Sequence, residues 1–173
     1  DPVHWGPVTL RGHDFNDGMF LFLSSFTEAM LASYLGMSCF RNEKDVDTIL
    51  LMMAGAGLIY TVPILWEARM SPQLHKNVYG YAAFDDFLQS VRFGGYRPQV
   101  FMTHGLVTSL FMLGPATAAM AANRLGMRVW HLSGRVCAWI LTCTIIICKS
   151  TGVWFYALCS LPLARWASVK LLT

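Results

Sequence analysis

Long apolar runs separated by short polar segments dominate this chain. A helix needs about 20 mostly apolar residues to cross the hydrocarbon core of a bilayer. Five runs approach or reach that length, at about 18–40, 48–66, 98–123, 129–149 and 152–172. They predict an all-α fold: a polytopic transmembrane helix bundle of about five spans over residues 17–173, after a surface loop at 1–16.

The division between the last two spans depends on Lys149. Val136–Cys148 and Gly152–Ala164 carry no charged residue, so they can be joined into one long helix or separated into two. In a joined helix Lys149 would lie near the bilayer centre, where a charge is expensive, whereas at a membrane face it costs little. The Ser-Thr-Gly sequence after it also offers a helix N-cap. We therefore expect two helices with a tight turn at Lys149–Gly152.

The longest polar connection runs from Met70 to Pro98. Within Phe84–Phe93, apolar side chains recur at helical spacing and polar ones occupy the other face. This pattern is typical of a short helix lying in the membrane interface. Pro98 suits the first turn of the third span, which places His104 in the first or second turn of that helix.

One carboxylate falls inside a predicted span. Glu28 should be protonated, paired or turned toward other helices, because an ionised carboxylate in lipid is costly. It can serve as a hydrogen-bonding residue between helices or line a polar cavity, and the sequence favours neither. The small residues of Ala54–Gly57 and Gly114–Ala122 predict faces for close helix packing.

The composition agrees with a bilayer environment. Hydrophobic residues make up 55% and charged residues 13%, with a mean hydropathy of +0.45, whereas soluble domains carry roughly a quarter charged residues. The net charge is only +3 and Lys and Arg are scattered, which argues against a nucleic-acid partner.

The five cysteines lack metal-binding spacings, so we expect apolar packing, no metal and no cofactor. The chain opens without an initiator Met and ends abruptly, which predicts a fragment of a longer protein.

The two predicted membrane faces carry nearly equal numbers of cations, which is unusual for a translocated face. The 13 Lys and Arg residues divide seven to six between the two sides of a five-span bundle. The short basic loop Arg124–Arg135 assigns its own side to the cytoplasm. On the opposite face the segments carrying Arg69, Arg92, Arg97 and Lys149 all end, and these cations can bind a polyanion such as a lipid-linked pyrophosphate.

Two histidines near this face are candidate general bases. His104 lies about 10 Å beyond Arg97 along a helix and is the first candidate. His75, in the polar connection, is the second. A hydrogen bond to a neighbouring helix is the simpler interpretation for His104, and a solvated surface position is the simpler one for His75.

Three sequence runs resemble a known family. They are LWEARMSPQLHKNVYGY, FGGYRPQVFMTHGL and ICKSTGVWFYALCSLPL, of which RPQVFMTHG is the most specific. They are similar to membrane proteins of the O-antigen ligase or polymerase family, including exopolysaccharide polymerisation homologues. The resemblance covers most of the chain from about Leu58 onward.

The resemblance implies a multi-pass protein of the bacterial inner membrane. Such a protein transfers a glycan from an undecaprenyl pyrophosphate carrier on the periplasmic side. By position, Arg97 and Lys149 would hold the pyrophosphate. The family has more helices and a large periplasmic loop carrying its usual catalytic histidine, so this chain alone is expected to be inactive. The alternative is a non-catalytic subunit that packs through its small-residue faces within a larger membrane complex.

Overall fold

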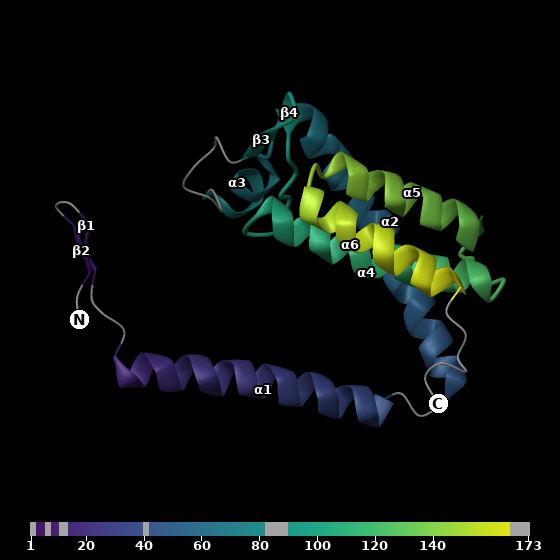
Figure 1. Ribbon diagram of the computed structural model, residues 1–173, viewed down its shortest axis with the longest axis horizontal. Coiled ribbons are helices and arrows are strands. Elements are labelled where there is room, and N and C mark those ends of the chain that lie inside the picture. Colours follow the sequence, from purple (N-terminus) through teal and green to yellow (C-terminus); the bar gives the residue numbers. More distant parts are fainter. Residues whose placement is uncertain (1–2, 6–7, 11–13, 40–41, 82–89, 167–173) are drawn as a thin grey trace. The chain divides into compact units, whose positions relative to one another are not determined.

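Three long helices and three shorter ones form the described part of the chain (Figure 1). The structure, a computed structural model, describes residues 3–5, 8–10, 14–39, 42–81 and 90–166. The helices long and apolar enough to cross a membrane are α1 (Phe15–Cys39), α2 (Glu43–Met70) and α4 (Gly105–Arg124). The shorter ones are α3 (Leu74–Tyr79), α5 (Gly134–Ile147) and α6 (Thr151–Trp166). The predicted all-α class with membrane-type helices is therefore confirmed, but only three of the five predicted spans reach spanning length in the described residues.

Three short antiparallel hairpins accompany the helices. They pair β1 (Val3–Trp5) with β2 (Val8–Leu10), β3 (Val91–Arg92) with β4 (Gly95–Tyr96), and β5 (Arg128–Val129) with β6 (Leu132–Ser133). The segment predicted as a surface loop at 1–16 thus contains a hairpin and the first residues of α1.

The chain divides into two units, Asp1–Val46 and Asp47–Thr173. Within unit 1, α1 buries none of its residues, and apolar side chains are exposed all around it. Its hydroxyls bond to carbonyls of the same helix: Thr27 donates to Leu23 over 2.7 Å and Ser33 to Ala29 over 2.8 Å. Glu28 is exposed on the surface of this helix. A helix that satisfies its polar groups internally while exposing apolar side chains is suited to lipid.

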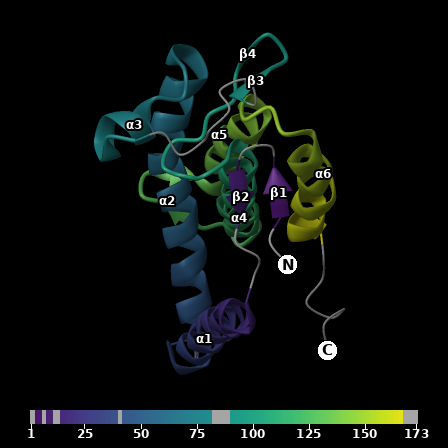
Figure 2. The same cartoon turned by 90° about the vertical axis from the view of Figure 1, so that its left-hand side faces the viewer.

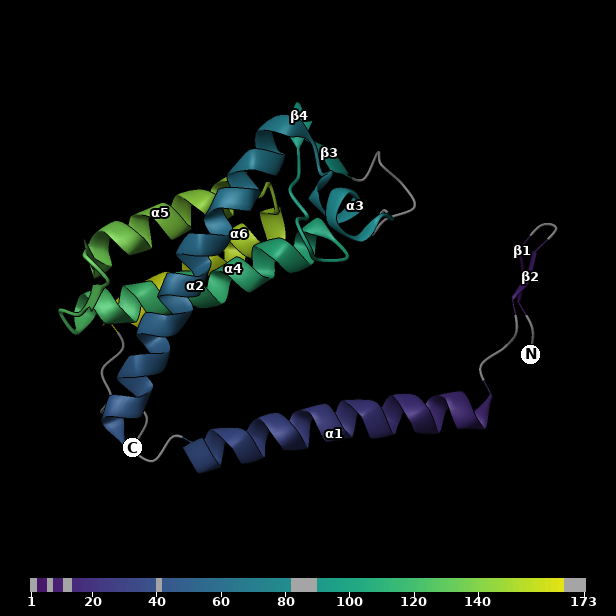
Figure 3. The same ribbon diagram turned by 180° about the vertical axis from the view of Figure 1, so that it is seen from behind.

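In unit 2, α4 is the central helix, with α5 and α6 packed against it. Figures 2 and 3 show α2 crossing the bundle on the side of α4 away from α6. The crossing is close because Gly57 of α2 lacks a side chain: a Cβ there would overlap with Pro115 of α4 and touch Leu141 of α5. Ala54, Ala116, Ala119 and Ala122 are fully buried. The small-residue faces predicted for packing are therefore largely used inside unit 2.

As in α1, several hydroxyl side chains of unit 2 form hydrogen bonds within their own helices. Thr61, Ser109, Thr142 and Thr144 donate to carbonyls four residues earlier in their own helices. Large apolar side chains such as Ile59, Leu158 and Trp139 remain exposed. Exposed apolar area on this scale is unfavourable in water and favourable in a bilayer. These are features of a membrane protein.

The predicted start of the third span is wrong. Helix α4 begins at Gly105, and residues 98–104 before it are not helical; of these, residues 98–100 are buried. Pro98 is therefore outside the helix, and His104 caps it instead of lying in its first turns. Val100 has a left-handed φ of 55°, which interrupts a helix at this position, and a carboxylate of α2 holds the amides of Gln99 and Val100.

The predicted separation of the last two spans is confirmed, although the first of them starts later than predicted. The hairpin β5–β6 occupies 128–133, and Ser133 caps α5 by accepting the Val136 amide over 3.4 Å. Lys149 ends the helix in the left-handed region with φ 52°. α6 then starts at Thr151, and residues 167–172 of the last predicted span lie outside the described residues.

Two other boundaries differ from prediction. α2 runs over Glu43–Met70, beyond both limits of the predicted span at 48–66. Most of the interfacial helix predicted over 84–93 falls at 82–89, outside the described residues. Its last part is wrong, because Val91–Arg92 is a strand paired with β4.

Candidate anion-binding site

The candidate site lies at one end of unit 2, where α2 finishes and α4 and α6 begin. We call it the Arg97 end, and the other end, where α4 finishes and α5 begins, the Arg135 end. Helix α4 has 20 residues, so the two ends are separated by roughly 30 Å, the thickness of a bilayer core.

The β3–β4 hairpin positions Arg97 next to the start of α4. Its turn uses Phe93 and Gly94 at φ 49° and 66°, and the Arg97 amide donates to the Ser90 carbonyl over 2.7 Å. The Arg97 side chain lies against Gly105, where an added Cβ would come within 2.8 Å of it. Only 3% of Arg97 is exposed. The missing side chain of Gly105 therefore makes room for a buried guanidinium.

Arg97 meets the turn between α5 and α6. Its Nη2 donates to Ser150 Oγ over 3.2 Å, although the two residues are 53 positions apart in the sequence. Lys149, the residue before Ser150, lies with its Nζ against Gly95 of β4, where a Cβ would overlap with it. The predicted convergence of Arg97 and Lys149 at one end of the bundle is thus seen in the structure.

The positive charge of Arg97 is incompletely compensated. Its Nε is buried without a hydrogen-bond partner, and in the described part of the chain no carboxylate stabilises its charge. Burial, and next the charge of Arg92, lower the pKa of Arg97 below its usual value. A guanidinium stays protonated in proteins, so a bound anion would offset both unfavourable effects.

Arg92 and Arg69 lie at the same end but are exposed. Arg92 is in β3, close enough to Arg97 for their charges to repel. Arg69 is in the last turn of α2, two residues after Glu67. The structure therefore brings Arg97 and Lys149 together, adds Arg92 beside them, and leaves Arg69 at the rim without a described contact to the other three.

Glu67 is the functional residue that sequence reasoning missed. It is fully buried, and its carboxylate accepts the amides of Leu74 at 2.9 Å, Gln99 at 2.8 Å and Val100 at 2.6 Å. Hydrogen bonds from several backbone amides stabilise a carboxylate in its ionised form and fix its position. Glu67 thus fixes the segment that leads from Arg97 to α4. In the sequence it looks like an ordinary acidic residue at a helix exit, so no pattern reveals this role.

The two candidate histidines differ in which ring nitrogen is engaged. His104 Nδ1 accepts the Leu106 amide over 3.1 Å, so its neutral ring carries the proton on Nε2. His75 Nδ1 lies 3.0 Å from the Tyr81 carbonyl oxygen, which can only accept, so its neutral ring keeps a lone pair on Nε2. Tyr79 and Tyr81 hold the His75 ring, with centroids 4.8 and 4.9 Å away. By this geometry His75 offers a basic nitrogen, whereas His104 is a helix cap.

No metal-binding chemistry is evident in the described residues. Within them, no group of three or more His, Cys, Asp or Glu side chains is placed to hold a metal ion. The five cysteines are free thiols, of which Cys137 and Cys148 are buried. Among the described residues, the Arg97 end offers guanidinium, ammonium, hydroxyl and imidazole groups, together with the Glu67 carboxylate and the Cys148 thiol.

Comparisons of the chain with protein-family models, with curated proteins and with solved structures give no significant match. The function is therefore inferred from the chemistry of the site and from the resemblance of short sequence runs.

Proposed function

We propose that this chain is part of a multi-pass glycan transferase or polymerase of the O-antigen ligase type in the bacterial inner membrane. Its donor is a glycan linked to undecaprenyl pyrophosphate, and the pyrophosphate binds at the Arg97 end on the periplasmic side. The observation that carries the proposal is the buried guanidinium of Arg97, which bonds to Ser150, lies beside the ammonium of Lys149 and has no carboxylate partner among the described residues.

These groups suit the departure of a pyrophosphate. When an acceptor hydroxyl attacks the anomeric carbon, the bond from that carbon to the pyrophosphate oxygen breaks and negative charge develops on the leaving group. Positioned cations stabilise that charge more in the transition state than in the ground state. Arg97 can donate two parallel hydrogen bonds to phosphate oxygens, and Lys149 acts as a point charge.

His75 is the better candidate for the base that takes the proton from the acceptor hydroxyl. A base must have a free lone pair within reach of that proton. The Nε2 of His75 meets the first condition, and α3 lies at the Arg97 end because Leu74 donates to Glu67. His104 would first have to give up its cap of α4.

Replacement of Arg97 or Lys149 by Ala tests the proposal in cells that depend on the protein for surface polysaccharide. We expect both variants to insert into the membrane and to lose the polysaccharide. Arg128→Ala, which removes a cation at the Arg135 end, is the matched control and should leave it unchanged. Wild-type polysaccharide in both Arg97→Ala and Lys149→Ala would exclude the proposal.

The non-catalytic subunit is the weaker alternative. It requires Ala54–Gly57 and Gly114–Ala122 to be free surfaces for partner helices. Gly57 packs on Pro115, and Ala116 and Ala119 are fully buried within unit 2. No further observation in the described residues favours that function.

A further inference from the structure

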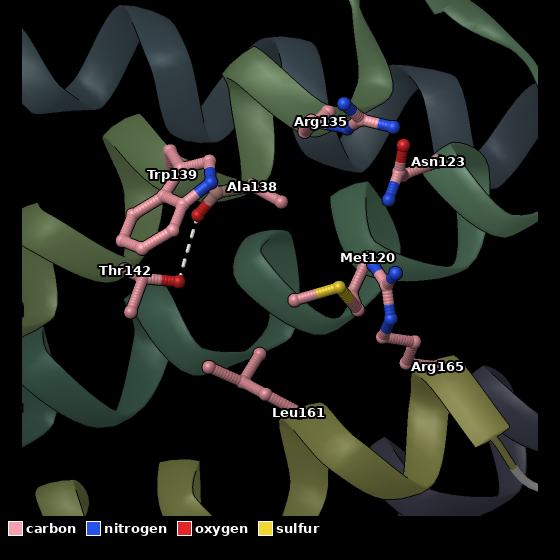
Figure 4. Close-up of a pocket in the computed structure, with 8 residues that line it drawn as sticks. All are labelled: Met120, Asn123, Arg135, Ala138, Trp139, Thr142, Leu161 and Arg165. Carbon is pink, nitrogen blue, oxygen red and sulfur yellow. Dashed lines mark hydrogen bonds between the residues drawn. The ribbon is translucent and has the colours of Figure 1, made fainter.

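A groove runs between α5 and α6 on the surface of α4. Two adjoining cavities, of about 140 and 490 Å³, share Thr142 and Leu161 and so form one continuous groove. The smaller cavity lies at the Arg135 end and is shown in Figure 4. The groove is thus distinct from the pyrophosphate site proposed above.

The lining of the larger cavity is almost entirely apolar. The larger cavity is bordered by Ile145, Ile146, Leu158 and Pro162 besides the two shared residues. The hydroxyl of Thr142 donates to the Ala138 carbonyl over 2.7 Å and is therefore satisfied within its helix. An apolar groove of this kind suits a hydrocarbon chain.

The mouth of the groove is cationic. Arg135, in the first turn of α5, and Arg165, in the last turn of α6, both line the smaller cavity. Figure 4 shows their guanidinium groups on the side of the cavity where Asn123 lies, while Trp139 and Thr142 lie opposite. Among the residues that the structure describes, no acidic one lines either cavity. Two guanidinium groups and an amide provide a set of donors for a phosphate.

Tryptophans place this mouth at the level of the lipid headgroups. Trp130, Trp139 and Trp166 are exposed by 63%, 67% and 74%, and all three lie toward the Arg135 end. Tryptophan is enriched at the boundary between hydrocarbon and headgroups. The groove therefore begins where a phospholipid has its phosphate and continues where it has its acyl chains.

We propose that the α5–α6 groove binds an anionic phospholipid, with one acyl chain between the helices and the phosphate held by Arg135 and Arg165. Charge complementarity selects this occupant. A zwitterionic choline headgroup would bring a quaternary ammonium toward two guanidinium groups. An apolar helix of a second copy would leave both guanidinium groups without an anion. Basic pockets between membrane helices are known to hold anionic headgroups on the cytoplasmic side.

Native mass spectrometry of the purified chain tests the preference directly. The probes are phosphatidylglycerol and phosphatidylcholine with identical acyl chains, added in equal amounts. We expect wild-type chain to retain mainly phosphatidylglycerol. Arg135→Gln and Arg165→Gln should each lower that preference by about five-fold, since one cation near a headgroup contributes about that factor. Arg128→Gln, which removes an equal charge at the same end but outside the groove, should keep it.

A second measurement does not depend on variants. Phosphatidylglycerol with a photoreactive group on its acyl chain is crosslinked to wild-type chain, and the labelled peptides are identified. Labels in Thr142–Ile146 and Leu158–Pro162 would support the proposal. Labels confined to α1 or α2, equal retention of the two lipids by wild-type chain, or unchanged preference in both groove variants would overturn it. A dimer that forms regardless of the lipid added would assign the groove to a second copy instead.

Discussion

At the scale of single residues, two buried charged side chains differ in how completely their hydrogen-bonding groups are paired. Within the described residues, Glu67 and Arg97 are the charged side chains that are buried. Glu67 is satisfied by three backbone amides, whereas Arg97 keeps a buried nitrogen without a partner. Buried polar groups in native proteins are normally paired, so an unpaired one calls for an explanation. The anion proposed to bind at the Arg97 end would provide that explanation for Arg97, and Glu67 keeps the supporting segment in place.

Replacing Glu67 by Ala should strongly destabilise the Arg97 end. The change leaves the amides of Leu74, Gln99 and Val100 without their acceptor, and each unsatisfied amide costs about 1–3 kcal/mol when buried. We expect a loss of about 3 kcal/mol or more, measured as a lower Tm of the detergent-solubilised chain. Glu28→Ala, an exposed carboxylate in α1, is the control and should change the Tm little. Equal melting of wild type and Glu67→Ala would show that these hydrogen bonds are not formed.

The histidine roles can be separated by a substitution that preserves the helix cap. Asn is a good N-cap residue, so His104→Asn should keep both stability and polysaccharide formation, whereas His104→Ala should cost about 1 kcal/mol of stability. His75→Ala should lose polysaccharide formation with little change in Tm. If His104→Asn melts like wild type but makes no polysaccharide, His104 is the base and the assignment to His75 is wrong.

At the scale of elements, the sequence predicts apolar helices well and their ends poorly. The turn at Lys149 follows from the cost of burying an ammonium in lipid, and the structure separates α5 from α6 there. The segment 98–104 looks like the start of a helix, but Val100 has a φ of 55° and Glu67 from another helix holds the amides of Gln99 and Val100. Contacts between distant residues leave no local pattern. The burial of Arg97 depends on the same kind of contact, with Ser150 and Gly105. The sequence position of Arg97 therefore predicts the end of the bundle at which it lies but not that its side chain is buried.

The crossing of α2 over α4 should depend on Gly57. A methyl group there would overlap with Pro115, and a helix pair cannot widen without losing packing. We expect Gly57→Ala to destabilise the chain by about 1–3 kcal/mol, as other overpacked cores are. Gly36→Ala in α1, where a Cβ meets nothing within 4 Å, is the matched control. It should be neutral or slightly stabilising, because Ala favours helix over Gly. Denaturation of both variants in detergent measures the difference.

At the scale of the whole molecule, each unit exposes the apolar surface that a bilayer environment favours. Apolar side chains are exposed along α1 and along the outer faces of α2, α5 and α6, and helix hydroxyls are satisfied internally. The two ends of unit 2 then differ in chemistry. The Arg97 end holds a buried guanidinium next to Lys149, and the Arg135 end presents exposed arginines and tryptophans.

Insertion across the bilayer predicts that the two ends of unit 2 lie on opposite sides. Single cysteines are placed at Thr151 and at Leu132, both exposed, after the exposed native Cys39, Cys143 and Cys159 are replaced by Ala. A membrane-impermeant maleimide should label Thr151→Cys from the periplasmic side of intact cells and Leu132→Cys only after the membrane is opened. Labelling of both positions from the same side would contradict a spanning arrangement.

Binding of the lipid carrier tests the central claim most directly. The chain in nanodiscs is titrated with undecaprenyl pyrophosphate and with undecaprenyl alcohol, which has the same hydrocarbon but no phosphate. Charge-assisted hydrogen bonds contribute about 1.5–3 kcal/mol each, so we expect the pyrophosphate to bind at least about ten-fold more tightly. The double variant Arg97→Ala/Lys149→Ala should abolish this difference. Equal binding of the two compounds by wild-type chain, or an unchanged difference in the double variant, would contradict the account.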